Sequence, residues 1–236
     1  MGISAVLLAY QEAENLNVLL PQIRQQLTAT GEPFEIIVVD APQALDPTPA
    51  ICQQHGARYT NQRYPQFGGA FRTGIEAARY DKFLIMDSDG SHRTEYITPI
   101  YQRFLQGADL VIGSRYVQGG ATYDAASSVL MSRLLNSIFR KVIGIKARDI
   151  STDFRMYDTA QLKKVQLTCS NYDILQEVLM KLKLNNPKLR IEEVPICFDK
   201  RMYGKSKRNL LVFMCSYIRT MFRLLRMRLQ AAHHSR

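Results

Sequence analysis

Two acidic residues separated by a single residue are the most chemically informative feature of this 236-residue sequence. Asp87 and Asp89 follow the apolar run KFLIM at 82–86, which is typical of a buried strand. Both carboxylates are therefore expected on a turn at the edge of a sheet. Two acids so placed can ligate one hard cation, Mg²⁺ or Mn²⁺, and leave positions open for a diphosphate. A solvated turn is the alternative for so short a motif, and the preceding strand favours the metal site.

The elements that must position this turn alternate between strand and helix in the first half of the chain. The predicted strands are residues 3–9, 35–40, 57–61, 82–86 and 109–113. The predicted helices are residues 15–27, 46–55, 68–78 and 94–105. This alternation predicts an α/β fold with a mostly parallel central sheet and helices on both faces. Ligands of such sheets bind beyond the carboxyl ends of the strands, where Asp40, Asp87 and Arg115 fall.

The second half of the chain is more mixed. Helices are predicted at 125–143, 172–184 and 209–230, and a loop followed by a strand is predicted at 149–158. The segment 189–198 is predicted as a strand, and Pro195 inside it favours a sheet edge. No linker divides the chain. We therefore expect one domain over residues 1–207 and an appendage over residues 208–236.

The net charge of +10 is concentrated at the C-terminal end. Residues 199–236 contain ten Lys or Arg and one acid, a net charge of +9, which leaves +1 for residues 1–198. Such a basic segment predicts an anionic partner, and the absence of a recognisable binding module argues against nucleic acid. The four cysteines form no C-x-x-C pair, which favours a reducing compartment. The sequence shows neither a signal-peptide pattern nor an apolar run long enough to span a membrane.

Eight short blocks, taken in order, resemble glycosyltransferase family 2 and within it the dolichol-phosphate mannose synthase branch. They are LAYQEAENL at 8–16, IIVVDAPQ at 36–43, FGGAFRTGI at 67–75, DSDGSHRTE at 87–95, GADLVIGSRY at 107–116, SRLLN at 132–136, RDISTDFR at 148–155 and EVPICFDKRMYGKSK at 193–207. Each block alone is a weak signal, but the ordered set covers most of residues 1–207. The resemblance implies the GT-A fold, which is a Rossmann-like α/β architecture.

The resemblance also implies roles for individual residues. The residues implied to bind the nucleotide sugar are Ala9, Tyr10, Glu12, Asp40, Asp87 and Ser88. Those implied to bind the metal, Mg²⁺ or Mn²⁺, are Asp87, Asp89 and Ser91. Those implied to bind an acceptor phosphate are Arg115, Arg133, Arg201, Ser206 and Lys207. The implied catalytic set is Asp89, Arg115, Arg133, Arg155 and Arg201.

The implied reaction is transfer of a sugar, with inversion, from a nucleotide-sugar to polyprenyl (dolichyl or undecaprenyl) phosphate. A phosphate monoester is ionised near neutral pH, so the enzyme must mainly position two anions and stabilise the leaving diphosphate. A related transferase acting on a sugar or protein hydroxyl is the alternative, with Asp153 or another acid as base. For Asp153 itself, a loop acid that caps a turn is the favoured interpretation. A non-catalytic, membrane-associated relative that has lost donor binding is a further alternative.

Three departures from the family pattern bear on these alternatives. Ala41 stands where a second acid is usual, and Pro42 and Gln43 replace Gly-Ser, which affects nucleotide recognition. Gln11 replaces an Asn of the first block, and Asp153 replaces a Gly. The sequence contains no Trp, which excludes the Q-x-x-R-W signature of processive polysaccharide synthases.

The last predicted helix, within residues 208–230, combines basic and apolar faces. Arg219, Arg223 and Arg226 share one face, and Arg228 falls on the apolar side. The residues of the apolar face are Leu211, Met214, Ile218, Met221, Phe222, Leu225 and Leu229. This pattern favours a helix lying on a membrane surface, at the cytoplasmic face. Packing against the protein body is one alternative, and an integral-membrane partner subunit is another.

Overall fold

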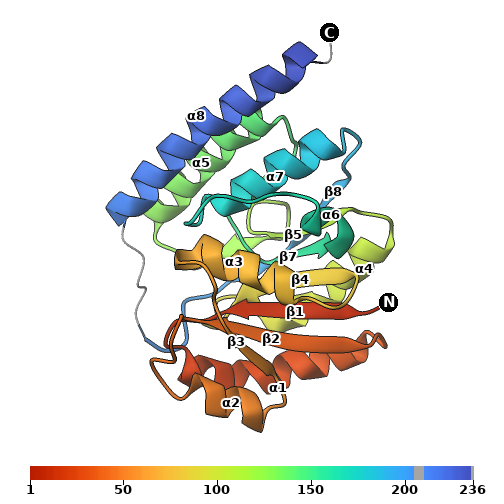
Figure 1. The fold of residues 1–236 in the computed structure, drawn as a ribbon, viewed down its shortest axis with the longest axis vertical. Helices are drawn as coiled ribbons and strands as arrows, with labels where there is room; N and C mark the ends of the chain where they lie inside the picture. Colours follow the sequence, from red (N-terminus) through yellow and green to blue (C-terminus); the bar gives the residue numbers. More distant parts are fainter. Residues whose placement is uncertain (205–209, 235–236) are drawn as a thin grey trace.

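The computed structural model describes residues 1–204 and 210–234, and within the last helix it describes the side chains of residues 216–231. A seven-stranded sheet with the order β3-β2-β1-β4-β7-β5-β8 forms the centre (Figure 1). Its strands are β1 (Ile3–Leu8), β2 (Phe34–Asp40), β3 (Arg58–Asn61), β4 (Lys82–Asp87), β5 (Leu110–Ser114), β7 (Arg155–Asp158) and β8 (Ile191–Pro195). A second sheet pairs β6 (Ala121–Thr122) with β9 (Cys197–Phe198).

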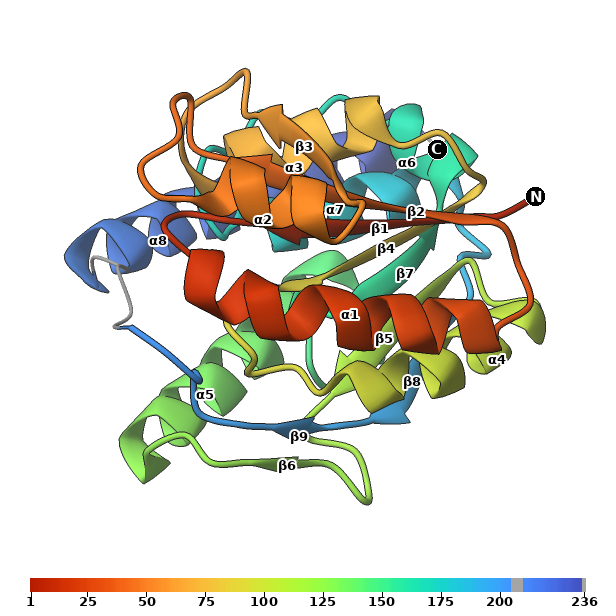
Figure 2. The same cartoon turned by 90° about the horizontal axis from the view of Figure 1, so that it is seen from below.

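The helices connect and cover these strands. They are α1 (Ala13–Ala29), α2 (Thr48–Gln54), α3 (Gln66–Ala77), α4 (Ile97–Leu105), α5 (Ala126–Ile143), α6 (Thr159–Lys163), α7 (Ile174–Asn185) and α8 (Leu210–His234). A short 3₁₀ helix, η1 (Thr94–Tyr96), precedes α4. Figure 2 shows α1 and α4 on one side of the main sheet and α3 on the other. The predicted α/β class, with helices on both faces, is therefore confirmed.

Strand register brings the polar ends of three strands to one edge. β1 pairs in parallel with β2 and β4, and Leu8 lies opposite both Val39 and Asp87. Asp40 follows Val39 and therefore falls at the same edge. β7 pairs antiparallel with β4 and β5, whereas the other pairings of this sheet are parallel. The edge formed by the carboxyl ends of β1, β2 and β4 is where a ligand of this fold is expected.

Alternating side chains of the strands fill two separate cores. Ile37 and Val39 of β2 face the core that contains α3, α6 and α7. Ile36 and Val38 face the opposite core, which contains α1 and α4. Successive residues of β2 point to opposite faces of the sheet, and both faces are buried. The strand is therefore apolar along most of its length. The runs therefore predicted strands well from the sequence.

The predicted strand at 189–198 is two strands in the structure. β8 ends at Pro195, and β9 begins at Cys197 in the other sheet, so that expectation is corrected. β8 does lie at an edge of the main sheet, as Pro195 predicts. β6 and α6 are too short to show a usable hydrophobic periodicity, so neither was predicted from the sequence.

The last helix, α8, packs on the protein body beside α5 and α7 (Figure 1). Tyr217, Thr220 and Leu224 are buried in this contact. Glu177 of α7 anchors it, and Arg223 NH2 lies 3.4 Å from Glu177 Oε1. Burial would raise the pKa of Glu177, but hydrogen bonds from Lys181 and the backbone outweigh it and lower the pKa to about 2.

Two arginines of α8 contact the protein body, which the helical spacing of the sequence did not predict. Arg223 contacts the body, and Arg228 donates to the carbonyl oxygens of Lys141 and Val142 at the end of α5. A cation is favourable at a helix C-terminus because the free carbonyl groups there carry partial negative charge. Arg219 and Arg226 remain exposed. Among the described helices, none is both long and apolar enough to cross a membrane.

Candidate active site

The turn after β4, residues 87–92, is called the metal turn below, and it gathers the carboxylates expected to bind a cation. Gly90 adopts a φ of +83°, a left-handed conformation that glycine takes without steric cost. Ser91 donates to Asp89 Oδ1 from its backbone N–H at 3.0 Å and from its Oγ at 2.5 Å. The same Oγ lies 3.4 Å from Asp87 Oδ2. The structure therefore brings Asp87, Asp89 and Ser91 together.

Two further side chains join this cluster, and neither was in the expected metal set. His92 Nδ1 lies 3.6 Å from Asp87 Oδ2 and 3.8 Å from Asp153 Oδ1. One ligand atom from each of these residues lies within 4.8 Å of the others. Asp153 stood out in the sequence as a departure from Gly, and the fold now places it beside Asp87.

His92 is buried and held in a neutral form. The backbone N–H of Asp87 donates to His92 Nδ1 at 3.1 Å, so that nitrogen carries no proton. Burial lowers the pKa of His92 and outweighs the nearby carboxylates. The rings of Phe154 and Phe198 pack against it, with centroids 5.0 and 5.1 Å away. Because the Nδ1 lone pair is engaged, the free donors of the cluster are carboxylate oxygens.

The donor set and its charge fit a divalent cation. Burial, followed by the charges of Asp153 and Asp89, raises the pKa of Asp87 well above its ordinary value. The three carboxylates therefore repel one another, and a bound cation would relieve that repulsion. Oxygen ligands of this kind suit Mg²⁺ or Mn²⁺.

The segment after β9, residues 199–204, is called the strap, and it crosses the metal turn. The backbone N–H of Met202 donates to the carbonyl oxygen of Asp89 at 2.9 Å. Arg201 NH2 lies 3.2 Å from Asp89 Oδ2, and Arg201 NH1 donates to both Glu12 oxygens at 2.8 Å. Three expected site residues, Glu12, Asp89 and Arg201, therefore meet although they are far apart in the sequence.

Asn15, which the sequence analysis did not single out, fixes this meeting point. It is buried on α1, and its Nδ2 donates to Glu12 Oε2 at 2.6 Å. Its amide also exchanges hydrogen bonds with the backbone of Tyr203 in the strap, at 3.1 and 3.3 Å. Asn15 therefore orients Glu12 and ties the strap to α1. The only signal in the sequence was its place in the first block.

The residues expected to bind the nucleotide sugar lie along the same sheet edge. They are Ala9, Tyr10, Glu12, Asp40, Asp87 and Ser88. Ser88 Oγ donates to the carbonyl oxygen of Leu8 at 2.7 Å, which joins the metal turn to the end of β1. About half of the surface of Tyr10 is exposed, so its ring is open to a ligand.

Asp40 is buried at the end of β2, and two unexpected residues surround it. Its Oδ1 accepts from the N–H of Ala41 at 2.8 Å, and its Oδ2 accepts from the Tyr59 hydroxyl at 3.1 Å. Asn61 Nδ2 donates to the Ala41 carbonyl oxygen at 2.7 Å and to the Tyr59 hydroxyl at 2.8 Å. Tyr59 and Asn61 of β3 therefore occupy the neighbourhood in which the family has its second acid.

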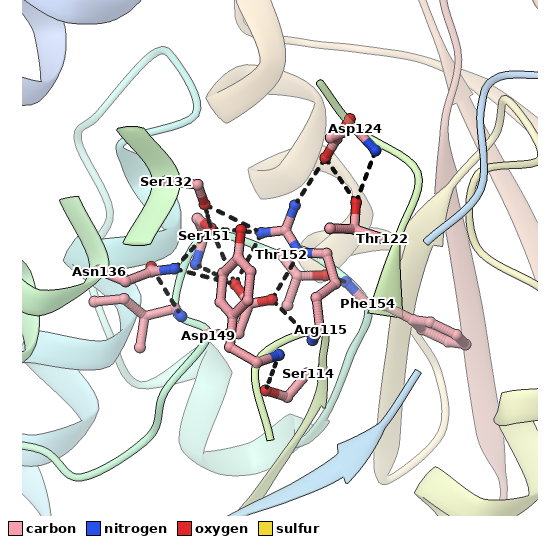
Figure 3. A network of polar contacts seen from close by, with 12 residues as sticks. Ser114, Arg115, Thr122, Asp124, Ser132, Asn136, Asp149, Ser151, Thr152 and Phe154 are labelled. Carbon is pink, nitrogen blue, oxygen red and sulfur yellow. Dashed lines mark hydrogen bonds and ion pairs between the residues drawn. The ribbon is translucent and has the colours of Figure 1, made fainter. Parts of the chain in front are cut away.

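A second polar cluster, called the arginine pocket, consists of Arg115, Tyr116, Arg133 and Asp149 with their partners, and Figure 3 shows Arg115 and Asp149 among them. Arg115 donates to Asp149 from Nε at 2.7 Å, from NH2 at 2.9 Å and from its backbone N–H at 3.1 Å. NH2 also donates to Ser151 Oγ at 2.7 Å. Burial would raise the pKa of Asp149, but the hydrogen bonds and charge of Arg115 outweigh it and lower the pKa. One edge of Arg115 is therefore committed to Asp149.

Helix α5 braces this pocket through the SRLLN block. Ser132 Oγ lies 3.0 Å from Ser151 Oγ, and Asn136 Oδ1 accepts from the N–H of Ile150 at 3.2 Å (Figure 3). Arg133 of the same helix is exposed, and its guanidinium carbon lies 5.2 Å from the centre of the Tyr116 ring. The guanidinium carbon of Arg115 lies 5.0 Å from that ring. Tyr116 therefore lies against two of the three arginines expected to bind phosphate.

Phe198 and the loop 149–153 join the two clusters. The Phe198 ring contacts His92 on the metal-turn side, and its centre lies 5.3 Å from the guanidinium carbon of Arg115. The loop supplies Asp149 to the arginine pocket and Asp153 to the metal turn. The cluster of carboxylates at the metal turn and the arginine pocket are therefore adjacent.

Arg155 departs from its expected role. It is fully buried, and its guanidinium donates to the carbonyl oxygens of Ile150 and Thr152 at 2.7 Å and of Leu175 at 3.2 Å. These bonds hold the loop 149–153 in place, so Arg155 positions other residues and offers no open edge to substrate. Ser206 and Lys207, also expected to bind phosphate, lie outside the described residues.

Comparison with known proteins agrees with this geometry. The model of the family "Glycosyl transferase family 2" matches residues 4–166, which is more than half of the chain. A solved structure of glucosyl-3-phosphoglycerate synthase from Mycobacterium tuberculosis, in complex with Mn²⁺, UDP and phosphoglyceric acid, superposes with a TM-score of 0.73. The superposition covers 95% of this chain and 78% of that one, at 18% identity, and it supports the fold alone.

Two curated relatives are similar in sequence. The dolichol-phosphate mannosyltransferase of Pyrococcus furiosus is 28% identical over 96% of this chain, which spans 64% of that protein's length. The undecaprenyl-phosphate mannosyltransferase of Micrococcus luteus is 29% identical over 88% of this chain and 87% of its own length. The family match, the fold and the ordered blocks agree, and the chain belongs to glycosyl transferase family 2, a family of sugar-transferring enzymes with the GT-A fold.

Proposed function

We propose that this chain transfers a sugar from a nucleotide-sugar donor to the phosphate of a polyprenyl phosphate. The observation that carries the proposal is the contact of the metal turn with the arginine pocket across Phe198. One cluster suits a metal-bound diphosphate, and the other suits a second anion. The names of the relatives from P. furiosus and M. luteus support a polyprenyl phosphate acceptor and a mannosyl group.

The donor side would use the edge formed by β1, β2 and β4. Tyr10, Asp40 and Glu12 would bind the base and ribose. Asp87 and Asp89 would hold Mg²⁺ or Mn²⁺, which when bound neutralises charge on the leaving diphosphate. Arg201, now paired with Glu12 and Asp89, would supply a guanidinium to the same diphosphate.

The acceptor side would use Arg133 and the NH1 edge of Arg115, where the protein makes only the longer ion pair with Asp124. A phosphate oxygen of the acceptor would attack the anomeric carbon from the side opposite the diphosphate. The new bond joins that oxygen to the sugar, the bond to the diphosphate breaks, and the configuration inverts. Because the attacking oxygen is already ionised, the step needs no general base. Asp149 would keep Arg115 correctly oriented.

A hydroxyl acceptor is the second candidate, and Asp153 is the observation that favours it. Its carboxylate is buried beside Asp87, at the centre of the cluster. In this alternative Asp153 would accept the proton of the attacking hydroxyl. The phosphoglycerate complex of the solved M. tuberculosis structure belongs to a protein that acts on a small acceptor.

A membrane surface would be the working environment, and α8 would contact it. Ile218, Phe222, Leu225 and Leu229 are 40–55% exposed and recur at helical spacing, away from the face that packs on the body. Exposed Arg219 and Arg226 flank this stripe. A basic-flanked apolar stripe suits an anionic lipid surface, where each basic residue contributes roughly 1 kcal/mol. The described cysteines Cys52, Cys169 and Cys197 are unpaired, which supports the cytoplasmic face.

A transfer assay tests the proposed reaction. The purified chain is given GDP-, UDP- and CDP-sugars with Mn²⁺ or Mg²⁺, and each donor is paired with farnesyl phosphate or with a hydroxyl acceptor. We expect product with the phosphate acceptor, and Asp89→Ala should lower its turnover by about 10²-fold or more, because metal charge stabilisation is worth several kcal/mol. Glu76→Gln, an exposed acid on α3, is the matched control and should behave as the wild type. Product with the hydroxyl acceptor alone would favour the second candidate.

Vesicle sedimentation tests the membrane contact. We expect the chain to sediment with vesicles rich in phosphatidylglycerol and the double variant Phe222→Gln/Leu225→Gln to bind about tenfold more weakly, because two exposed apolar side chains are lost. Leu105→Gln, which removes an exposed leucine of α4, is the control and should bind as the wild type. A change in oligomeric state with unchanged vesicle binding would instead assign the stripe to a protein partner.

A further inference from the structure

The loop between β6 and α5 places a carboxylate at the edge of Arg115 that faces away from Asp149 (Figure 3). Asp124 Oδ2 lies 3.6 Å from Arg115 NH1. The two side chains differ in exposure, which is 9% for Arg115 and 36% for Asp124. Thr122 Oγ1 donates to Asp124 Oδ2 at 3.0 Å and accepts the Asp124 N–H at 3.1 Å. Asp124 is therefore held by its own loop, at the open side of the pocket.

The guanidinium of Arg115 has one edge that the protein does not saturate. Asp149 and Ser151 take the hydrogen bonds of Nε and NH2. At 3.6 Å, the contact of NH1 with Asp124 is an ion pair but is too long for a hydrogen bond. A long pair of this kind, with one partner about a third exposed, contributes little to stability. A better-fitting anion can therefore take this edge.

Tyr116 gives an independent sign that the pocket receives a ligand. Its ring lies against both Arg115 and Arg133. Its hydroxyl oxygen is buried and makes no hydrogen bond in the structure. A buried hydroxyl without a partner is unfavourable, and a ligand oxygen at this place would offset that cost. The Tyr116 hydroxyl and the two guanidinium groups that lie against its ring are hydrogen-bond donors that suit an oxyanion.

We propose that Asp124 is a resident carboxylate that occupies the NH1 edge of Arg115 and is displaced by the phosphate of the acceptor. The inference rests on the proposed function and adds a residue that sets acceptor affinity. A carboxylate presents two oxygens to a guanidinium much as a phosphate does. Asp124 lowers acceptor affinity, because its negative charge must move away from the arginine before the phosphate binds.

Calorimetric titration with farnesyl phosphate and with inorganic phosphate tests this role. Asp124→Asn keeps the size of the side chain and its bond to Thr122 but removes the charge. We expect the variant to bind farnesyl phosphate roughly two- to fivefold more tightly than the wild type, the equivalent of a weak exposed ion pair. Nucleotide binding with Mn²⁺ should not change. Glu76→Gln removes one charge from an exposed pair with Arg63 and should leave phosphate affinity unchanged.

A second variant tests the role of Asp124 without introducing the amide group of Asp124→Asn. Thr122→Val removes the hydroxyl that holds the carboxylate and should also tighten phosphate binding, by a smaller factor. Equal or weaker phosphate binding in Asp124→Asn, with normal nucleotide binding, would overturn the role of Asp124 alone. Absence of phosphate binding in every protein, while nucleotides still bind, would instead overturn the phosphate acceptor of the proposed function.

Discussion

The metal turn and the arginine pocket lie on either side of Phe198 and differ in how their charges are balanced. At the metal turn, Asp87, Asp89 and Asp153 gather around a neutral His92, and Arg201 is the cation that reaches them. In the arginine pocket, Asp149 fully satisfies one edge of Arg115, and Arg133 stands nearby on α5. The metal turn is therefore short of positive charge, whereas in the arginine pocket Arg115 and Arg133 lie near two carboxylates, those of Asp149 and Asp124.

Two aspartates show how this difference arises. Asp87 and Asp149 are the same residue type, and burial acts on both in the same direction. The pKa of Asp87 is raised because its nearest charges are other carboxylates. The pKa of Asp149 is lowered because Arg115 holds it with two side-chain hydrogen bonds. Asp149 belongs to a completed structural pair, whereas Asp87 lies among carboxylates whose repulsion a cation would relieve.

The largest effect on stability is expected from Asp149→Asn, which breaks the completed side. The substitution leaves the Arg115 guanidinium buried without its counter-charge, so the free energy of unfolding should fall by about 3 kcal/mol at pH 7. The pKa of Asp149 is lowered from 3.8, so its stabilising contribution is present above that pH and is lost as the pH falls further. Urea unfolding at pH 7 and at pH 3 measures both points.

The matched control for this prediction is Asp124→Asn, on the exposed edge of the same arginine. Its ion pair is longer and more open to water, so its loss should change the free energy of unfolding by about 0.5 kcal/mol or less. Equal destabilisation by the two variants would contradict the division of Arg115 into a structural edge and a ligand edge. A wild-type advantage over Asp149→Asn that stays constant down to pH 3 would contradict the assigned pKa direction.

The sequence predicted the residues of the metal turn better than the residues packed around it. The reason is that the turn depends on neighbours in the sequence, whereas its surroundings depend on distant segments. Asp87 and Asp89 belong to one strand end and one turn, and both elements have clear sequence patterns. Asp153 joins them through the antiparallel entry of β7 between β4 and β5, which no local pattern announces. Asn15 and Asp149 were missed as partners for the same reason, because their contacts depend on the packing of distant segments.

Arg155 shows where a motif misleads. An arginine in a block shared with glycosyltransferases was expected to contact substrate, but the structure buries it among backbone carbonyl oxygens. The guanidinium donates hydrogen bonds whether it binds a substrate or holds a loop, so only tertiary packing distinguishes these two roles. Gln11 is a second residue whose surroundings the sequence did not reveal, because its backbone adopts a left-handed φ of +57°. Asn, which the family has there, tolerates that conformation better than Gln.

The helix α8 illustrates a third limit. Helical spacing predicted its basic and apolar faces, but a wheel cannot tell which side meets the protein body. The structure turns Tyr217 and Leu224 inward and leaves Phe222 and Leu225 exposed. Arg223 bonds to Thr168 Oγ1 at 2.8 Å, which depends on where the 168–177 segment lies. The charge pattern was therefore visible in the sequence, and its division between body and solvent was not.

A smaller effect, of opposite sign, is expected from Asp87→Asn in the metal turn. In the metal-free protein, burial and the charges of Asp153 and Asp89 disfavour the ionised form of Asp87, so replacing its carboxyl group with a neutral amide should raise the free energy of unfolding at pH 7, on the order of 1 kcal/mol. Added Mn²⁺ should reverse the order of stability, because the wild type gains the free energy of metal binding and the variant does not. Thermal unfolding with and without Mn²⁺ measures both differences.

The reversal matters more than either value, because it separates a metal site from an ordinary acidic turn. If Asp87 had only a structural role, its replacement would lower stability with and without Mn²⁺, as the replacement of Asp149 should. Glu76→Gln controls for the loss of one surface charge and should show no Mn²⁺ dependence beyond that of the wild type. Opposite stability changes from Asp87→Asn and Asp149→Asn would show that Asp87 belongs to a cation site and Asp149 to a structural ion pair.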